Sequence, residues 1–223
     1  MMSVKNFLKD NSEQEFKEFS QKLAIEGEYP ILGVRIPILR QFAKKLVKEQ
    51  DILALGILTD DSFEEVLLQG FVIAYSKLAL SDKKQYIDNY LSKAHSWGLI
   101  DSFVSSFNHQ DKELMFSWLE DYISSGETFK TRFGFVMMMK YLDDEHVEKI
   151  VEAVIKTKSE EYYVEMAQAW LLAKMAIKYP DVVCELLDKK CLNKFTHNKT
   201  IQKMVESYSI DKDLKIKVKG KRA

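Results

Sequence analysis

Proline, glycine and cysteine are all scarce in this chain of 223 residues, which has 3 prolines, 8 glycines and 2 cysteines. A β-sandwich or β-barrel needs many turns marked by glycine and proline, so this scarcity argues against an all-β fold. Cys184 and Cys191 cannot form a disulfide framework, and we expect two reduced thiols in a cytoplasmic protein. Long helices joined by short polar loops fit the composition better.

Membrane segments, metal motifs and nucleotide motifs are also missing. No apolar run reaches the roughly 18 residues that a transmembrane helix needs, so no membrane association is expected. The N-terminal sequence has no apolar segment typical of a signal peptide. The four histidines, His95, His109, His146 and His197, show no metal-ligand spacing, and no glycine-rich phosphate loop occurs. The sequence therefore predicts neither a metal site nor a cofactor.

Charge is nearly balanced overall but unevenly distributed. The formal net charge is −1, which argues against strong non-specific binding to nucleic acid. From Lys194 to the end, however, there are nine Lys or Arg residues and three Asp or Glu residues. The basic tail at about 211–223 is interpreted either as a phosphate-binding strip or as a solubilising tail.

Helical periodicity and helix-capping signals run through most of the chain. Ser62 followed by Glu65 forms a capping-box pattern ahead of apolar residues at helical spacing, which predicts a helix over 62–79. Ser81 and Asp82 are expected to cap the next helix, and Pro180 suits the first turn of a later one. Further helices are expected at residues 97–107, 112–123, 128–142, 143–156 and 160–178.

The buried helices begin at regular intervals. Phe63, Trp97, Phe129, Tyr163 and His197 lie near their first turns, at steps of 34, 32, 34 and 34 residues. This period is typical of arrays of helical pairs. We therefore predict an all-α, HEAT-like helical-repeat solenoid with a curved, concave face, formed as one domain over residues 1–223.

The first candidate functional segment is the punctuated, basic stretch at 29–46. Gly33 is expected to adopt a backbone conformation that other residues resist. Arg35, Arg40 and Lys44 could contact phosphates, or they could be solvated cations on an ordinary interhelical loop.

Two further segments place aromatic and charged residues on helices. Trp97 and Asp101 are four residues apart and share a helix face, where an indole and a carboxylate could together stabilise a cation. Arg132 interrupts an apolar run and needs a partner, which could be an internal carboxylate such as Asp101. Trp170 could complete an aromatic cage or simply pack in the core.

Taken in order, five segments resemble the AlkD-type DNA alkylation repair glycosylases. The similarity covers roughly residues 15–210. The segments are LGVRIPILRQFAK at 32–44, FEEVLLQGFVIAY at 63–75, SWGLIDSF at 96–103, RFGFVMMMKY at 132–141 and QAWLLAK at 168–174.

This resemblance implies a function and a set of residue roles. The protein would be a DNA glycosylase that excises cationic N3- or N7-alkylated purines from duplex DNA, without a metal or cofactor. Asp101 matches the family's catalytic carboxylate, Trp97 and Trp170 match aromatics that flank the lesion, and Arg132 matches a DNA-contacting arginine. Arg35, Arg40 and Lys44 would add contacts to the DNA.

The chain departs from the family pattern at several positions. Ala24 stands where a Tyr is common, with Glu26 close by, Ala169 replaces a usual Gly, and Ser209 stands where Arg is frequent. The alternative hypothesis is therefore a non-catalytic HEAT-like module that binds DNA or a protein partner. The protein is expected to be a monomer in either case.

Overall fold

The computed structural model describes residues 3–23, 29–108 and 111–223, and within these ranges the chain is all-helical. The helices group into two compact units, Met1–Asp111 and Lys112–Ala223. The predicted all-α fold class is confirmed, whereas the single domain remains a prediction. No helix in the described ranges combines the length and hydropathy needed to cross a bilayer.

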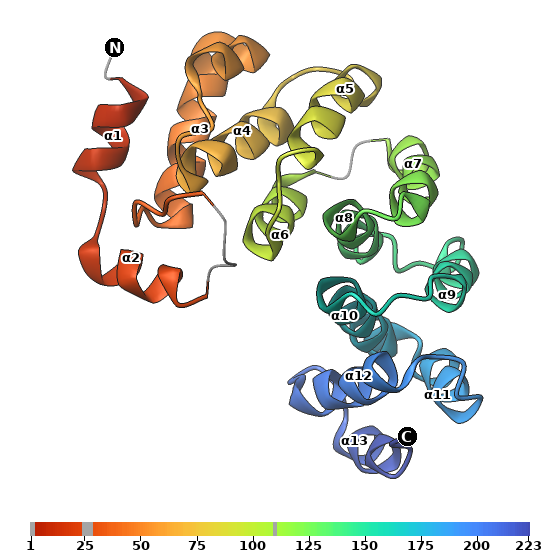
Figure 1. Ribbon diagram of the computed structural model, residues 1–223. Helices are drawn as coiled ribbons and strands as arrows, with labels where there is room; N and C mark the ends of the chain where they lie inside the picture. The colour runs from red at the N-terminus through yellow and green to blue at the C-terminus, as the bar shows by residue number, and fades with distance from the viewer. Residues whose placement is uncertain (1–2, 24–28, 109–110) are drawn as a thin grey trace. The chain divides into compact units, whose positions relative to one another are not determined.

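In the first unit, α4 is the central helix, and α3, α5 and α6 pack on it (Figure 1). Every residue from Glu64 to Ala74 of α4 is buried, so the helix has no solvent-facing stripe. The helices are α1 Val4–Asp10, α2 Gln14–Gln21, α3 Ile36–Gln50, α4 Phe63–Tyr75, α5 Leu80–Leu91 and α6 Trp97–Ser106, with a 3-10 helix at Asp51–Ile57.

In the second unit, α8, α10 and α12 pack side by side, and α7, α9 and α11 form an outer layer beside them (Figure 1). The inner helices carry most of the buried side chains, whereas α9 buries only Ile150 and Val154. The helices are α7 Lys112–Ser124, α8 Thr128–Met138, α9 Val147–Lys156, α10 Tyr162–Lys178, α11 Pro180–Asp188, α12 Lys194–Glu206 and α13 Lys212–Lys219.

The spacing of the buried helices agrees with the predicted repeat. Helices α4, α6, α8, α10 and α12 begin 34, 31, 34 and 32 residues apart. The predicted starts at 97, 112 and 128 are those of α6, α7 and α8, and two predicted helix-start signals are also confirmed. Ser62 caps α4 by accepting a hydrogen bond from the Glu65 amide at 3.2 Å, and Pro180 lies in the first turn of α11.

Four predicted helix boundaries are wrong. Helix α4 ends at Tyr75 rather than at 79, with Ser76 as its C-cap. Ser81 and Asp82 do not cap α5, because the helix already begins at Leu80, with Ala79 as its N-cap. Helix α8 ends at Met138 rather than at 142, because the chain turns towards α9. That helix begins only at Val147, after a turn in which the His146 amide donates to Asp143.

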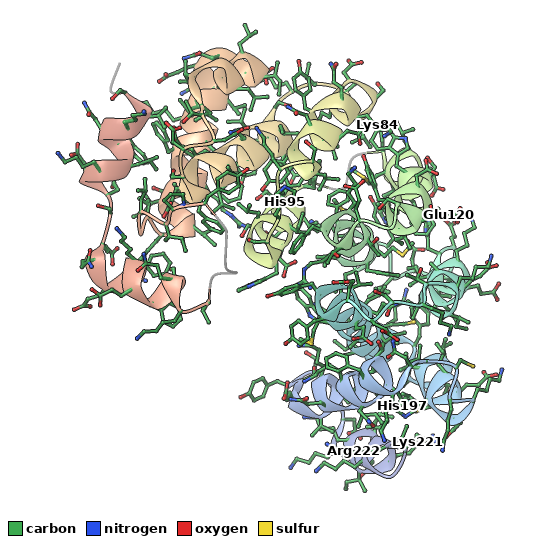
Figure 2. The ribbon with its side chains drawn as sticks, in the orientation of Figure 1. Lys84, His95, Glu120, His197, Lys221 and Arg222 are labelled. Carbon is green, nitrogen blue, oxygen red and sulfur yellow. The ribbon has the colours of Figure 1, made fainter. Side chains whose placement is uncertain are left out.

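The expected basic tail is largely helical and is attached to α12. The His197 ring contacts the Lys221 carbonyl at 2.7 Å, and the Asn198 side chain bonds the backbone of Ala223 (Figure 2). Val218 of α13 is buried. These bonds hold the C-terminal residues against the last inner helix.

Candidate functional site

Trp97 and Asp101 lie on the expected common face of α6. Ser96 caps this helix by accepting from the Leu99 amide at 3.4 Å, which makes Trp97 its first residue. Gly98 lies against the Phe63 ring, where an added Cβ would come within 3.1 Å. The Trp97 side chain is 37% exposed, so its ring is accessible from outside while Asp101 is half-buried.

Both side chains line one pocket of the first unit, with a volume of about 250 Å³. The pocket is mainly apolar, and the charged residues of its described lining are two carboxylates, Glu64 and Asp101. A small apolar cavity with carboxylates and an exposed indole suits a cationic or partly cationic group. The remaining lining residues are Phe16, Phe19, Ser20, Leu23, Ile31, Val34, Ile36, Phe63, Leu67, Ser96, Gly98 and Ser102.

Glu64 organises the loop that forms one side of this pocket. Its carboxylate accepts hydrogen bonds from the backbone amides of Leu32, Gly33 and Val34, at distances between 2.7 and 3.1 Å. The side chain is only 2% exposed, so these three amides provide the hydrogen bonds that a buried carboxylate requires. Sequence reasoning missed this residue, because an acidic residue in a first helical turn is ordinarily assigned to the helix dipole.

Gly33 has the backbone conformation expected from the sequence. Its φ is +93°, and an added Cβ would lie 2.6 Å from the Glu13 carbonyl oxygen and 2.7 Å from Lys17 Cβ. The Glu13 amide in turn donates to the Gly33 carbonyl at 3.0 Å. The loop therefore contacts α2 on one side and Glu64 on the other, and only glycine fits between them.

The predicted cations of the first unit each contact an aromatic ring. Arg35 forms two-pronged hydrogen bonds with Glu13 at 2.8–3.0 Å and lies 4.8 Å from the Phe16 ring. The hydrogen bond from Arg35 lowers the pKa of Glu13. This ion pair offsets the positive charge of Arg35, a residue predicted from the sequence to contact DNA.

Arg40 and Lys44 lie one turn apart on α3 and face α4. The Arg40 guanidinium lies 5.4 Å from the Phe71 ring and donates to Ser105 Oγ at 2.6 Å. Lys44 Nζ lies 5.4 Å from the Tyr75 ring. Neither cation is among the described residues that line the pocket.

The other two candidates, Arg132 and Trp170, belong to the second unit. Arg132 is 6% exposed, and its Nη1 donates to the Tyr163 carbonyl at 2.9 Å, which connects α8 to α10. Trp170 is half-buried near the middle of α10. Ala169 is fully buried and Ser209 is exposed. Ala24 and Glu26 lie outside the described residues, as does His109.

Comparison with known proteins gives one finding. The model of a family described as DNA alkylation repair enzyme matches residues 4–212. No curated protein matches the chain.

Proposed function

The chain belongs to the DNA alkylation repair enzyme family, and from that premise we propose that it is a DNA glycosylase. Its substrate would be duplex DNA carrying a purine alkylated at N3 or N7. The observation that carries the proposal is the pocket that Trp97 and Asp101 line together in the first unit.

The chemistry of these lesions matches the residues of the pocket. A purine alkylated at N3 or N7 is cationic, and cleavage of the bond between C1′ and the base nitrogen gives the electron pair to the base. Positive charge then develops on the deoxyribose while a water oxygen bonds to C1′ and releases a proton. A carboxylate beside C1′ stabilises this charge and orients the water. In our proposal, Asp101 has that role.

Trp97 would act on the same charge through its ring. Indole is the side chain with the strongest cation–π attraction, and its effect increases where water is excluded. The apolar lining contributed by Phe16, Phe19 and Leu23 would exclude water from the side of the sugar. The roles of Trp170 at the lesion and of Arg132 at the DNA backbone, which the family resemblance implies, remain predictions.

A second candidate function is a module that binds DNA or a protein without cleaving the glycosidic bond. Two contacts favour it. Arg35 is engaged with Glu13, and the guanidinium of Arg132 is buried against the Tyr163 carbonyl. The Glu13 carboxylate offsets the charge of Arg35, and the Tyr163 carbonyl occupies a donor of Arg132, so both contacts leave less of these side chains available for phosphates.

The first experiment is to incubate the full chain at low salt with duplex DNA containing one N7-methylguanine, and to measure the rate of abasic-site formation. A blank without protein runs beside it. We expect release well above the blank, and a decrease of about 100-fold or more in Asp101→Asn, because that variant loses the carboxylate charge. Asp121→Asn, a change of an exposed carboxylate in α7, is the matched control and should retain full activity.

The outcomes separate the two candidates. Release no faster than the blank, from folded protein and on both N7-methylguanine and N3-methyladenine, would reject the glycosylase. Binding of the same duplex without release would then support the non-catalytic module. If Asp101→Asn releases the base as fast as the unchanged chain does, the reaction does not take place in this pocket.

A further inference from the structure

Three potential metal ligands come together in the second unit. Glu113 lies in the first turn of α7, and Glu145 and His146 lie in the turn before α9. One ligand atom of each residue lies within 4.8 Å of the others. We propose that Glu113, Glu145 and His146 bind a divalent transition-metal ion such as Zn²⁺.

The His146 ring is fixed in an orientation suited to a metal ligand. It is 2% exposed, and its centroid lies 4.3 Å from that of Phe116 and 5.8 Å from that of Tyr141. Its Nδ1 lies 2.5 Å from Asp143 Oδ1, and because an ionised carboxylate only accepts, Nδ1 carries the proton. When the ring holds only this proton, the lone pair is on Nε2, as in the carboxylate–histidine–metal arrangements of zinc proteins. The charged ring instead donates from Nε2 towards Glu113 and must release that proton before a metal ion can bind.

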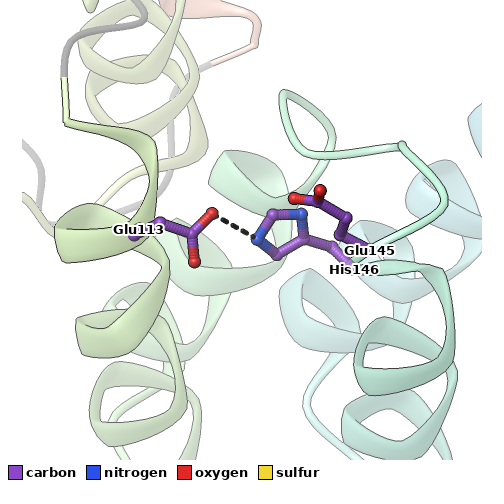
Figure 3. Close-up of side chains that lie close together, drawn as sticks. All are labelled: Glu113, Glu145 and His146. Atoms are coloured by element: carbon purple, nitrogen blue, oxygen red, sulfur yellow. Dashed lines mark ion pairs between the residues drawn. The ribbon is translucent and has the colours of Figure 1, made fainter.

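The Glu113 carboxylate faces Nε2 of the ring, whereas the Glu145 carboxylate lies near the other ring nitrogen (Figure 3). Glu113 Oε1 is 3.5 Å from His146 Nε2, and Glu145 lies beside the ring (Figure 3). Two tetrahedral ligands, each about 2.0–2.1 Å from a zinc ion, are about 3.3 Å apart. Because one ligand atom of each residue already lies within 4.8 Å of the others, rotation of the exposed Glu113 and Glu145 side chains would bring the three groups to bonding distance, with the fourth position open to water.

The surroundings predict moderate affinity. The Glu113 side chain is 78% exposed, so an ion can enter from solvent, but binding must order a mobile carboxylate. Two cations also lie close to the site, Lys112 at 3.8 Å from Asp143 and Lys149 at 5.9 Å from the Phe116 ring. A bound ion would connect α7 to the start of α9, and we infer a stabilising role for it.

Sequence reasoning excluded a metal site because no pair of histidines or cysteines has ligand spacing. The proposed site has only one histidine and takes a carboxylate from another helix. Such a set has no local sequence pattern, since the fold alone brings Glu113 next to His146.

The test is titration of the full chain with ZnCl₂ by calorimetry, with Tm measured in the presence and absence of the ion. We expect one ion per chain with Kd in the range of about 1–100 μM. A free Zn²⁺ concentration about 100 times Kd should raise Tm by about 5 °C or more.

Exposed ligands allow variants that preserve the fold. Glu113→Gln and Glu145→Gln should each weaken zinc binding by about tenfold or more and abolish most of the Tm increase. His146→Gln should do the same, but its ring is packed against Phe116, so the two glutamate variants decide the question. His95→Gln and Cys191→Ser are the controls for binding by an exposed histidine or thiol and should bind zinc as the unchanged chain does.

Three results would overturn the proposal. One is the absence of binding up to about 1 mM ZnCl₂ in folded protein. Another is binding that persists unchanged when Glu113 and Glu145 are both replaced by Gln. Loss of binding in Cys191→Ser alone would also overturn it, because it would assign the ion to a thiol.

Discussion

Helices α4 and α10 hold equivalent positions in the two units, and each is hydrogen-bonded to the loop that precedes it. Six residues after its start, each helix has a glutamine whose amide donates to a threonine carbonyl of that loop. Gln69 donates to Thr59 at 2.8 Å, and Gln168 donates to Thr157 at 2.9 Å. The repeat seen in the helix spacing therefore extends to individual side chains.

The second residue of each helix differs between the units. In α4 it is Glu64, which binds three amides of the loop beside the pocket. In α10 it is Tyr163, whose ring lies 5.6 Å from that of Phe129 and whose carbonyl accepts from Arg132. The second residue of the helix thus binds the loop beside the pocket in the first unit, whereas in the second unit it packs two inner helices together.

The largest expected effect tests how tightly the loop of the first unit is held. Gly33→Ala should destabilise the protein by about 3 kcal/mol, because a left-handed φ costs about 1–2 kcal/mol and the new Cβ would overlap the Glu13 carbonyl. Gly126→Ala in the second unit is the matched control, since its φ is +76° but no atom lies within 4 Å of its Cβ position. It should cost only about 1 kcal/mol, measured by urea unfolding. Equal costs would show that the loop moves freely away from α2.

A change at Glu64 tests the hydrogen bonds that distinguish α4 from α10. Glu64→Gln should destabilise the protein by about 2 kcal/mol, because hydrogen bonds to a charged acceptor are stronger and an amide nitrogen cannot accept. Glu65→Gln is the control, since Glu65 is also buried but accepts from the hydroxyls of Thr59 and Ser62. Its cost should stay below about 1 kcal/mol in the same unfolding experiment. A reversed order would remove the special role of Glu64.

Trp97→Ala and Trp170→Ala compare the units in function. If the pocket of the first unit is the reaction site, Trp97→Ala should lower the rate of base release by about tenfold, since one cation–π contact is worth about 1–2 kcal/mol. Trp170→Ala should reduce it less, because in our proposal that ring only flanks the lesion. Single-turnover kinetics on the N7-methylguanine duplex measures both. A larger loss in Trp170→Ala would place the reaction nearer the second unit.

The features that local sequence determines were predictable. The Ser62 cap, Pro180 at a helix start, and the left-handed Gly33 each depend on a few neighbouring residues. Trp97 and Asp101 were expected to share a face because helical geometry fixes the direction of residues four apart. The structure agrees and places both in one pocket.

Features that depend on distant partners could not be predicted. Glu64 and Glu65 are adjacent, and the sequence indicates a local role only for Glu65, in the capping box with Ser62. No local pattern indicates that Glu64 binds a loop some 30 residues away. Arg132 clearly needed a partner, but the Tyr163 carbonyl has no sequence signal. The start of α5 was misplaced because Ser81 and Asp82 are good caps, whereas the tertiary fold starts the helix at Leu80.

The smallest expected effect concerns Glu165, a buried carboxylate of α10 that is 8% exposed. Burial raises the pKa of Glu165, and a hydrogen bond with Asn193 opposes the increase. At pH values between the unfolded-state pKa and the raised folded-state pKa of Glu165, the folded state binds more protons than the unfolded state. The free energy of unfolding therefore falls as the pH rises through this range. At pH 7 the full cost of the buried charge is present.

Glu165→Gln removes this charge, so it should raise Tm at pH 7 by up to about 2 °C and leave it nearly unchanged at pH 4, where the unchanged chain is largely protonated in both states. Glu148→Gln, at an exposed first-turn position of α9, is the control and should give no gain at pH 7. Calorimetric scans at both pH values measure the difference. Glu64 and Glu165 are both buried, but three backbone amides donate to Glu64 and fewer groups donate to Glu165. If Glu165→Gln stabilises the protein while Glu64→Gln destabilises it, hydrogen bonding rather than burial alone decides whether these helices tolerate a carboxylate.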